Sequence, residues 1–298
     1  MLKMQGPLLL ACNHPNSFLD AVILDLLFEQ PIWSLARGDV FKSKTIIRLL
    51  TAVKILPVYR TSEGAENLSE NYKTFDACIE LFRQNGIVLI FSEGKCINEW
   101  HLRPLKKGTA RLAIQCWKEG IPLRVLPVGI NYSSFRRFGK NIHLRFGESI
   151  TSSVIRDKET DGLRNQAFNQ QLQAALRPLV FEIPKTDQRL QEEKLAVPVP
   201  VVKKILLLLP AAMGLLVHAP LYLPLKRFAW KKANHNDHYD SVLVSVILFT
   251  YPFYLLLLAL LTFWITQSAL AWLLLLLLPF CAWAYVQLKP QLDKQHPQ

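Results

Sequence analysis

PLLLACNHPNSFLDAVILDLLF, residues 7–28, combines a short apolar run, a polar break and a second apolar run. The first run, PLLLAC, has the length of a buried strand, and the last, AVILDLLF, has helical spacing. Between them NHPNSFLD places a histidine and a carboxylate, His14 and Asp20, six positions apart. A strand that passes through a polar loop into a helix is the repeating unit of α/β proteins, so this stretch predicts that fold class.

The same alternation continues to about residue 150. Short apolar runs are separated by longer amphipathic segments, which predicts an α/β fold with a sheet flanked by helices. Further strands are expected at IWSLA (32–36), KILPVY (54–59), GIVLIF (86–91), RVLPVGINY (124–132) and NIHLRFGESI (141–150). Helices are expected at 63–85, 105–119 and 161–182.

The composition changes sharply near residue 200, and no charged residue occurs between Ser241 and Leu288. A bilayer crossing takes about 20 apolar residues, so this run is long enough for two crossings and indicates an integral membrane protein. The net charge is +12. No basic stripe interleaved with aromatic residues and no nucleic-acid-binding motif accompanies it, so we expect an anionic phospholipid membrane as the partner and no nucleic acid.

These features predict a catalytic domain at 1–185, a linker at 186–204 and a C-terminal helical membrane region at 205–298. The first apolar piece, 205–223, contains Pro210 and Pro220 and is followed by Pro224. It lies between two basic clusters, so we expect it to be re-entrant or interfacial. The pieces at 242–264 and 269–286 are expected to form a hairpin whose two ends are cytoplasmic.

His14 and Asp20 have a structural and a catalytic interpretation. Ser17 and Asp20 resemble a capping box at the start of a helix. A carboxylate in the first helical turn also points back at the preceding loop, where Asp20 can hold one ring nitrogen of His14. The other nitrogen can then take a proton from a hydroxyl that attacks an acyl carbonyl.

Four blocks of the sequence resemble, in order, those of the glycerolipid acyltransferase family: NHPNSFLD (13–20), VYR (58–60), FSEG (91–94) and LPVGI (126–130). This family includes glycerol-3-phosphate and 1-acylglycerol-3-phosphate acyltransferases. Five residues separate the His and Asp of the first block, whereas the commonest form has four; the longer spacing resembles a branch of the family. The resemblance implies a mixed sheet flanked by helices, direct acyl transfer from acyl-CoA or acyl-carrier protein, and a glycerol phosphate acceptor.

The resemblance also implies roles for individual residues. His14 is the general base and Asp20 its partner, Arg60 is a phosphate ligand, Glu93 and Gly94 belong to the acceptor site, and Pro127 shapes the acyl-donor side. The sequence around LRPLKKGTARLA adds Lys106, Lys107 and Arg111 as candidate substrate-binding cations, the alternative being solvated residues at the start of a helix. No metal or other cofactor is expected.

Other interpretations remain open. Cys12 lies two residues before His14 and is a candidate nucleophile, although a small apolar core residue fits it better. His235, Asp237 and His238 in NHNDHYD (234–240) faintly resemble metallohydrolase ligands. A non-catalytic lipid-binding or scaffold protein is the non-enzymatic alternative.

Overall fold

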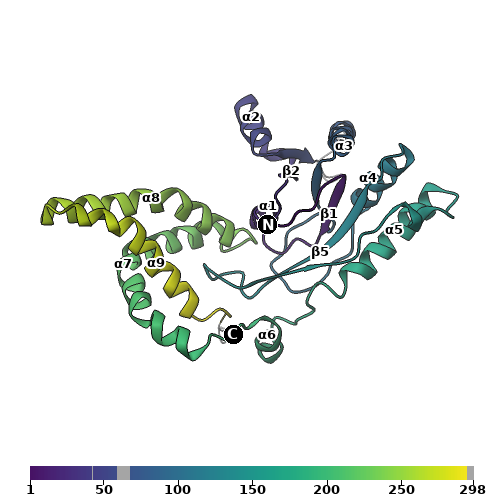
Figure 1. Cartoon of the computed structure of the whole chain (residues 1–298). Helices are drawn as coiled ribbons and strands as arrows, with labels where there is room; N and C mark the ends of the chain where they lie inside the picture. Colours follow the sequence, from purple (N-terminus) through teal and green to yellow (C-terminus); the bar gives the residue numbers. More distant parts are fainter. Residues whose placement is uncertain (42, 59–67, 294–298) are drawn as a thin grey trace. The chain divides into compact units, whose positions relative to one another are not determined.

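The computed structural model describes residues 1–41, 43–58 and 68–293. Two compact units form in it (Figure 1). The first comprises residues 1–131 and 143–182, and the second 132–142 and 183–298. The first unit contains the sheet, and the second contains the long apolar helices.

The sheet of the first unit has six strands in the order β3-β2-β4-β1-β5-β6. Strand β1 lies inside the sheet, parallel to β4 and to β5, and β2 is parallel to β3 and to β4. The predicted mixed sheet and all six expected strands are confirmed. Their bounds are β1 Leu8–Cys12, β2 Ile32–Arg37, β3 Ile55–Val58, β4 Ile87–Phe91, β5 Arg124–Tyr132 and β6 Ile142–Phe146.

Every residue of β1 is fully buried. An uninterrupted apolar run is typical of a strand that lies inside a parallel sheet with both faces covered. Leu9 and Ala11 pack into a core cluster with residues from α3, α4 and α5, so helices cover this face of the sheet. The helices of the first unit are α1 Phe18–Asp25, α2 Lys44–Ala52, α3 Leu68–Arg83, α4 Lys107–Lys118 and α5 Asp161–Leu176.

The predicted linker is partly helical. Helix α6, Gln188–Leu195, lies within residues 186–204, and α7 already begins at Val201. The Asp187 side chain caps α6 by accepting a hydrogen bond from Leu190 N–H at 2.9 Å. Such a cap satisfies a free N–H group of the first turn, which explains why this charged stretch becomes helical.

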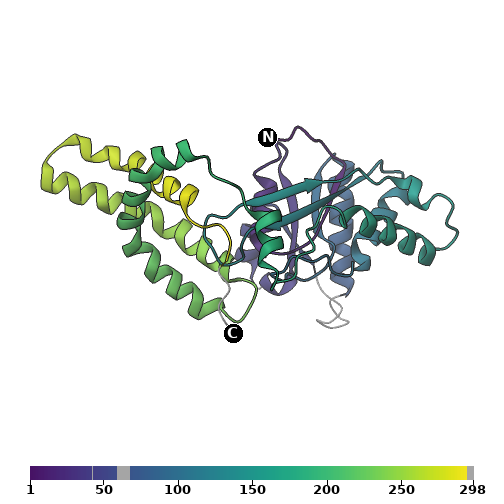
Figure 2. The same cartoon turned by 90° about the horizontal axis from the view of Figure 1, so that it is seen from below.

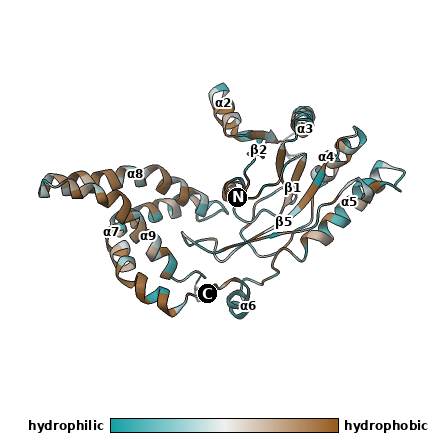
Figure 3. Cartoon of the chain, in the orientation of Figure 1, coloured by the Kyte–Doolittle hydropathy of each residue, from teal (hydrophilic) through white to brown (hydrophobic). Residues whose placement is uncertain are grey.

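Three long helices dominate the second unit: α7 Val201–Ala233, α8 Tyr239–Thr266 and α9 Leu274–Leu288, the last preceded by the short helix η5 Ala269–Leu273. Among the described residues, α7, α8 and the combined 269–288 helix are each long and apolar enough to cross a membrane. Figure 3 shows how apolar residues extend along these helices. Side chains such as Phe249, Phe253 and Trp264 are more than 70% exposed, which fits contact with lipid.

Helices α8 and α9 form the expected hairpin. Gln267 adopts the left-handed conformation at the end of α8 (φ 51°) and reverses the chain. At the other end of the hairpin, the loop at 139–140 meets both helices. Lys140 pairs with Asp240 at the start of α8, and a Cβ atom on Gly139 would lie 2.5 Å from Val286 near the end of α9. We call this the open end of the hairpin.

Both ends of α7 lie at the open end. Near the start of α7, Lys203 Nζ donates to Gln287 Oε1 of α9 at 2.6 Å. At the end of α7, Ala229 and Ala233 form a buried cluster with Tyr239 of α8.

The middle of α7 packs further along the hairpin. A Cβ atom on Gly214 would lie 2.1 Å from the carbonyl oxygen of Cys281, and His218 Nε2 lies 3.1 Å from the Tyr251 hydroxyl. The helix therefore bends between its ends, as both views show (Figures 1 and 2). Its internal prolines, Pro210, Pro220 and Pro224, supply the physical cause, because a proline lacks the N–H that continues the helical ladder. The segment 205–223 is thus part of one long helix with a bend, and its re-entrant or interfacial placement stays a prediction.

Candidate active site

His14 and Asp20 form a close pair in the first unit. His14 Nδ1 lies 2.8 Å from Asp20 Oδ2, and the Asp20 side chain is fully buried while that of His14 is 17% exposed. Because Nδ1 faces the carboxylate, Nε2 is the ring nitrogen that can exchange a proton with a substrate. The arrangement predicted from NHPNSFLD is present in the structure.

The polar break between β1 and α1 positions this carboxylate. Asp20 lies in the first turn of α1, and its Oδ2 also accepts a hydrogen bond from Asn16 N–H at 2.9 Å. The predicted capping box does not form, because the Ser17 side chain makes no capping hydrogen bond. Asp20 is directed at the loop that precedes the helix, and Ser17 turns the chain there with a φ of 54°.

The ends of neighbouring parallel strands bring the site together. Cys12, the last residue of β1, is opposite Phe91 of β4 and Val128 of β5. The residues that follow β1 and β4 therefore emerge at one edge of the sheet, where α/β proteins place their ligand sites. Asn13 fastens this edge: its side chain donates to Ile130 O at 3.0 Å and accepts from Ile130 N–H at 2.8 Å.

The His14 ring is stacked on Phe91. The ring centroids are 3.8 Å apart and the planes differ by 10°. Two constraints therefore act on the imidazole, the Phe91 face and the Asp20 carboxylate. A general base held in one orientation avoids the entropic cost of ordering it during the reaction.

Glu93 holds the loop that carries His14. The residue is 4% exposed, and its Oε2 accepts from His14 N–H at 3.0 Å. Its other oxygen accepts from Arg103 N–H at 2.9 Å, and the Arg103 guanidinium reaches Oε2 at 2.9 Å. Both carboxylate oxygens of Glu93 thus accept hydrogen bonds from His14 and Arg103. Glu93 is therefore a buried residue that contacts the backbone of the base.

Gly94 lies under the stem of Lys106. It has a φ of +69°, and a Cβ atom there would lie 3.0 Å from Lys106 Cγ. Lys106 immediately precedes α4, and its N–H donates to Ser92 O at 2.7 Å. The structure thus joins the predicted Gly94 and Lys106 at one place beside Glu93. Lys107 and Arg111 are exposed in the first turns of α4.

The remaining predicted residues have different outcomes. Pro127 is buried in β5 and lies opposite Ala11 of β1. The next residue, Val128, lies opposite Cys12, the last residue of β1. Arg60 lies outside the described residues. Cys12 is fully buried, and burial, followed by the charge of Asp20, raises the pKa of its thiol well above the usual value. A buried, protonated thiol is a poor nucleophile, which favours the core interpretation.

Sequence reasoning did not single out Asn13, Phe91 or Arg103. Asn13 and Phe91 are the first residues of two of the four blocks, but an amide and a phenyl ring give no chemical signal by themselves. Arg103 occurs in the basic stretch LRPLKKG. Its pairing with a carboxylate ten residues earlier depends on how the chain folds back after β4.

Residues 1–131 match the family model for acyltransferases. The domain defined by this site is therefore an acyltransferase domain, and the chain is an acyltransferase enzyme of lipid metabolism. The matched domain, residues 1–131, is of the kind found in the glycerolipid acyltransferases, as the four blocks indicated. No curated protein matches the chain.

Proposed function

We propose that the enzyme transfers a fatty acyl group from acyl-CoA or acyl-carrier protein to a hydroxyl of glycerol-3-phosphate or 1-acylglycerol-3-phosphate, with His14 as general base. The observation that carries the proposal is the buried Asp20 carboxylate, 2.8 Å from His14 Nδ1, at the end of the central strand. A histidine held by a carboxylate is suited to activating a hydroxyl.

The reaction takes place in one transfer. His14 Nε2 accepts the proton of the acceptor hydroxyl as its oxygen bonds to the thioester carbonyl carbon. The tetrahedral intermediate then collapses, the carbon–sulfur bond breaks, and the thiolate takes the proton from His14. Asp20 stabilises the imidazolium that exists between these steps. No acyl-enzyme is formed, in agreement with the burial of Cys12.

Glu93 is a positioning residue in this proposal. Its carboxylate fixes the backbone at His14 and orients Arg103, so its influence on the acceptor passes through these two residues. Gly94 permits Lys106 to cross beside the site. Lys106, Lys107 and Arg111 are proposed contacts for the acceptor phosphate, because exposed cations can bind an anion without a desolvation cost of several kcal/mol, the order of magnitude typical of buried ions. Arg60 is a further proposed phosphate ligand, on the resemblance of VYR (58–60) to the family's second block. Pro127 is proposed to shape the acyl-donor side.

The membrane helices fit a lipid substrate. Acyl thioesters are made in the cytoplasm and a lysolipid acceptor lies in the leaflet, so we place the catalytic domain on the cytoplasmic face. The basic residues in the first and last turns of α7, including Lys203, Lys204 and Lys232, agree with the positive-inside tendency.

The decisive experiment is a matrix of acyl-CoA and acyl-carrier-protein donors against glycerol-3-phosphate, 1-acylglycerol-3-phosphate and other lysolipids, with purified protein in detergent. Acyl transfer to a glycerol phosphate that disappears in His14→Ala supports the proposal. Equal transfer by a folded His14→Ala protein would contradict it.

The metallohydrolase alternative gains no support from the fold. Among the described residues, no three His, Cys, Asp or Glu side chains are grouped as metal ligands would be. Asp240 of the same stretch pairs with Lys140. A scaffold protein without catalysis would have no chemical need for the paired His14 and Asp20. The donor and acceptor matrix distinguishes a scaffold from an enzyme, because a scaffold would transfer no acyl group.

A further inference from the structure

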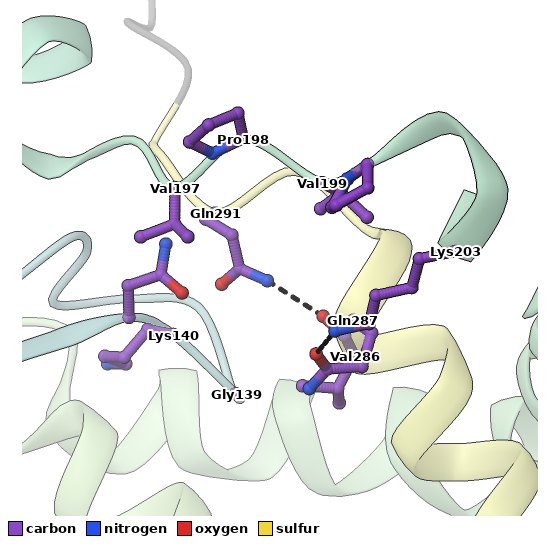
Figure 4. A pocket seen from close by; sticks show the side chains of 11 residues that line it. Gly139, Lys140, Val197, Pro198, Val199, Lys203, Val286, Gln287 and Gln291 are labelled. Atoms are coloured by element: carbon purple, nitrogen blue, oxygen red, sulfur yellow. Dashed lines mark hydrogen bonds between the residues drawn. The ribbon is translucent and has the colours of Figure 1, made fainter.

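A small cavity lies at the open end of the hairpin, in the second unit. Its volume is about 120 Å³, far above the 10–15 Å³ that one water molecule needs by about the same measure. The loop at 139–141, the extended segment 197–200, the start of α7 and the end of α9 surround it. Figure 4 shows Lys140 on one side and Lys203 on the other, with Gln291 between them.

One wall of the cavity is cationic. Lys203 reaches into it from the first turn of α7, and within the described part of the chain its ammonium is held by the Gln287 amide and not by a carboxylate. It also lies 5.7 Å from the centroid of the Trp283 ring. Lys140 has a side chain only 6% exposed and pairs with Asp240.

Among the residues that the structure describes, two buried amide atoms at the cavity have no hydrogen-bond partner, Asn141 Nδ2 and Gln291 Oε1. The Gln291 Nε2 group is already used, because it donates to Val286 O at 2.8 Å. A buried polar atom without a partner is costly, so such atoms commonly indicate a missing ligand or water. Here Asn141 Nδ2 is a donor and Gln291 Oε1 is an acceptor.

Further positive charge lies just beyond the cavity. Burial, together with Arg137 and Lys140, lowers the pKa of Lys289 to about 8. Asp240 and Asp293 balance part of this charge through Lys140 and Arg137. A nearby anion would lessen the repulsion that remains among these cations.

We propose that the cavity binds a phosphate group, with Lys203 and the Asn141 amide donating to its oxygens and the Gln291 carbonyl accepting from a neighbouring hydroxyl. Val197, Pro198 and Val199 give the opposite wall an apolar character. The cavity lies at the start of α7 and the end of α9, and phospholipid headgroups occur at the ends of membrane-spanning segments. The site is outside the catalytic unit and does not rest on the proposed acyl transfer.

The test compares ligands by the thermal unfolding midpoint of the full chain in neutral detergent. The probes are dioleoyl phosphatidylglycerol, inorganic phosphate and dioleoylglycerol, which lacks a phosphate. We expect phosphatidylglycerol to raise the midpoint in a concentration-dependent way and dioleoylglycerol not to do so. If inorganic phosphate gives the same rise, the phosphate site stands and its ligand is soluble. Equal rises with dioleoylglycerol and phosphatidylglycerol would overturn the site.

Lys203→Gln and Lys204→Gln form a matched pair. Both remove one charge from the start of α7, but only Lys203 lines the cavity, while Lys204 is exposed. We expect Lys203→Gln to weaken the apparent affinity by about tenfold, since charged hydrogen bonds contribute more than neutral ones, and Lys204→Gln to leave it unchanged. Equal losses of affinity in the two variants would mean that binding depends on general surface charge and not on the cavity. That result would contradict the proposal.

Asn141→Asp provides a second variant with nearly the same volume. It replaces the donor by a negative charge, so it should abolish the phosphate-dependent rise. If it binds as well as the wild type, the cavity is not a phosphate site. Circular dichroism of each variant before the titration checks that the helices are intact.

Discussion

His14 Nδ1 and Asp20 Oδ2 lie 2.8 Å apart, and substitution of each residue tests its role. We expect His14→Ala to lower the turnover by about 100- to 10,000-fold, the usual contribution of a general base. Asp20→Asn should give a comparable loss, because it removes the charge that orients the ring. The measurement is steady-state acyl transfer by detergent-purified protein.

His101→Ala is the matched control for this pair. His101 is exposed and also faces a carboxylate, that of Glu182, in the same unit. We expect near-normal turnover from it. A similar loss in both histidine variants would trace the effect to folding and not to the base.

Glu93→Gln tests the positioning role of a buried carboxylate. The change removes the buried carboxylate that pairs with Arg103, and breaking a buried ion pair typically costs about 3–5 kcal/mol in free energy of unfolding. Arg103 Nε keeps its longer contact with Glu99, at 3.5 Å. We expect a value toward the lower end, since Arg103 is 16% exposed, together with a fall in kcat that exceeds any change in KM.

Glu80→Gln serves as the comparison for that prediction. Glu80 pairs with Arg83 at 3.4 Å, and both side chains are more than half exposed. Exposed pairs contribute less than about 1 kcal/mol, so little stability should be lost in urea titrations. Equal losses in the two variants would remove the argument for Glu93.

Gly94→Ala tests the contact with Lys106. Gly94 and Gly120 both have a positive φ, +69° and +74°, so alanine at either should cost about 1–2 kcal/mol in backbone strain. Only at Gly94 does the new Cβ meet a side chain. We therefore expect Gly94→Ala, but not Gly120→Ala, to raise the KM for the phosphorylated acceptor. An unchanged KM would separate Lys106 from the acceptor site.

At the scale of elements, α7 depends on a close approach between two helix backbones. A Cβ atom at Gly214 would lie 2.1 Å from Cys281 O, so Gly214→Ala requires α7 and α9 to separate. We expect a lower thermal unfolding midpoint in detergent. Gly162→Ala in α5 meets nothing closer than 3.9 Å and should leave the midpoint unchanged or raise it, because alanine is the better helix former. Equal midpoints for the two variants would contradict the packing.

For the whole molecule, the bend of α7 leads to a prediction about membrane topology. Both ends of α7 lie at the open end of the α8–α9 hairpin, so we expect α7 to enter and leave the membrane on the cytoplasmic side, while Gln267 lies across it. Lys204→Cys, Lys232→Cys and Gln267→Cys, each in a background without the five native cysteines, can be probed with an impermeant thiol reagent in sealed cells.

Labelling of position 267 alone supports this topology. Labelling of 204 or 232, but not of both, would mean that α7 crosses the bilayer. In disrupted cells all three positions should be labelled. A position that stays unlabelled there is buried within the protein, so its lack of labelling in sealed cells says nothing about the membrane side.

Local pattern was sufficient for much of this molecule. The apolar run at 8–12 specifies a strand buried on both faces, and the uncharged run after Ser241 specifies two helices that are long and apolar enough to cross a membrane. The six-residue spacing places Asp20 in the first turn of a helix and His14 in the loop before it. Both positions follow from residues that are close in the sequence. Periodicity of apolar residues and short-range geometry are properties of neighbouring residues, so the sequence alone determined them.

Tertiary structure decided which of these pieces meet. Glu93 lies 79 positions from His14 and contacts its backbone only because β1 and β4 are adjacent in the sheet. The capping-box pattern at Ser17 was overridden, because Asp20 stabilises His14 and the N–H of Asn16 instead of the helix start. The prolines of α7 permit the bend, and the contacts of α7 with α8 and α9 set the direction of its path. Long-range contacts depend on strand order and helix packing, which no local period of the sequence encodes.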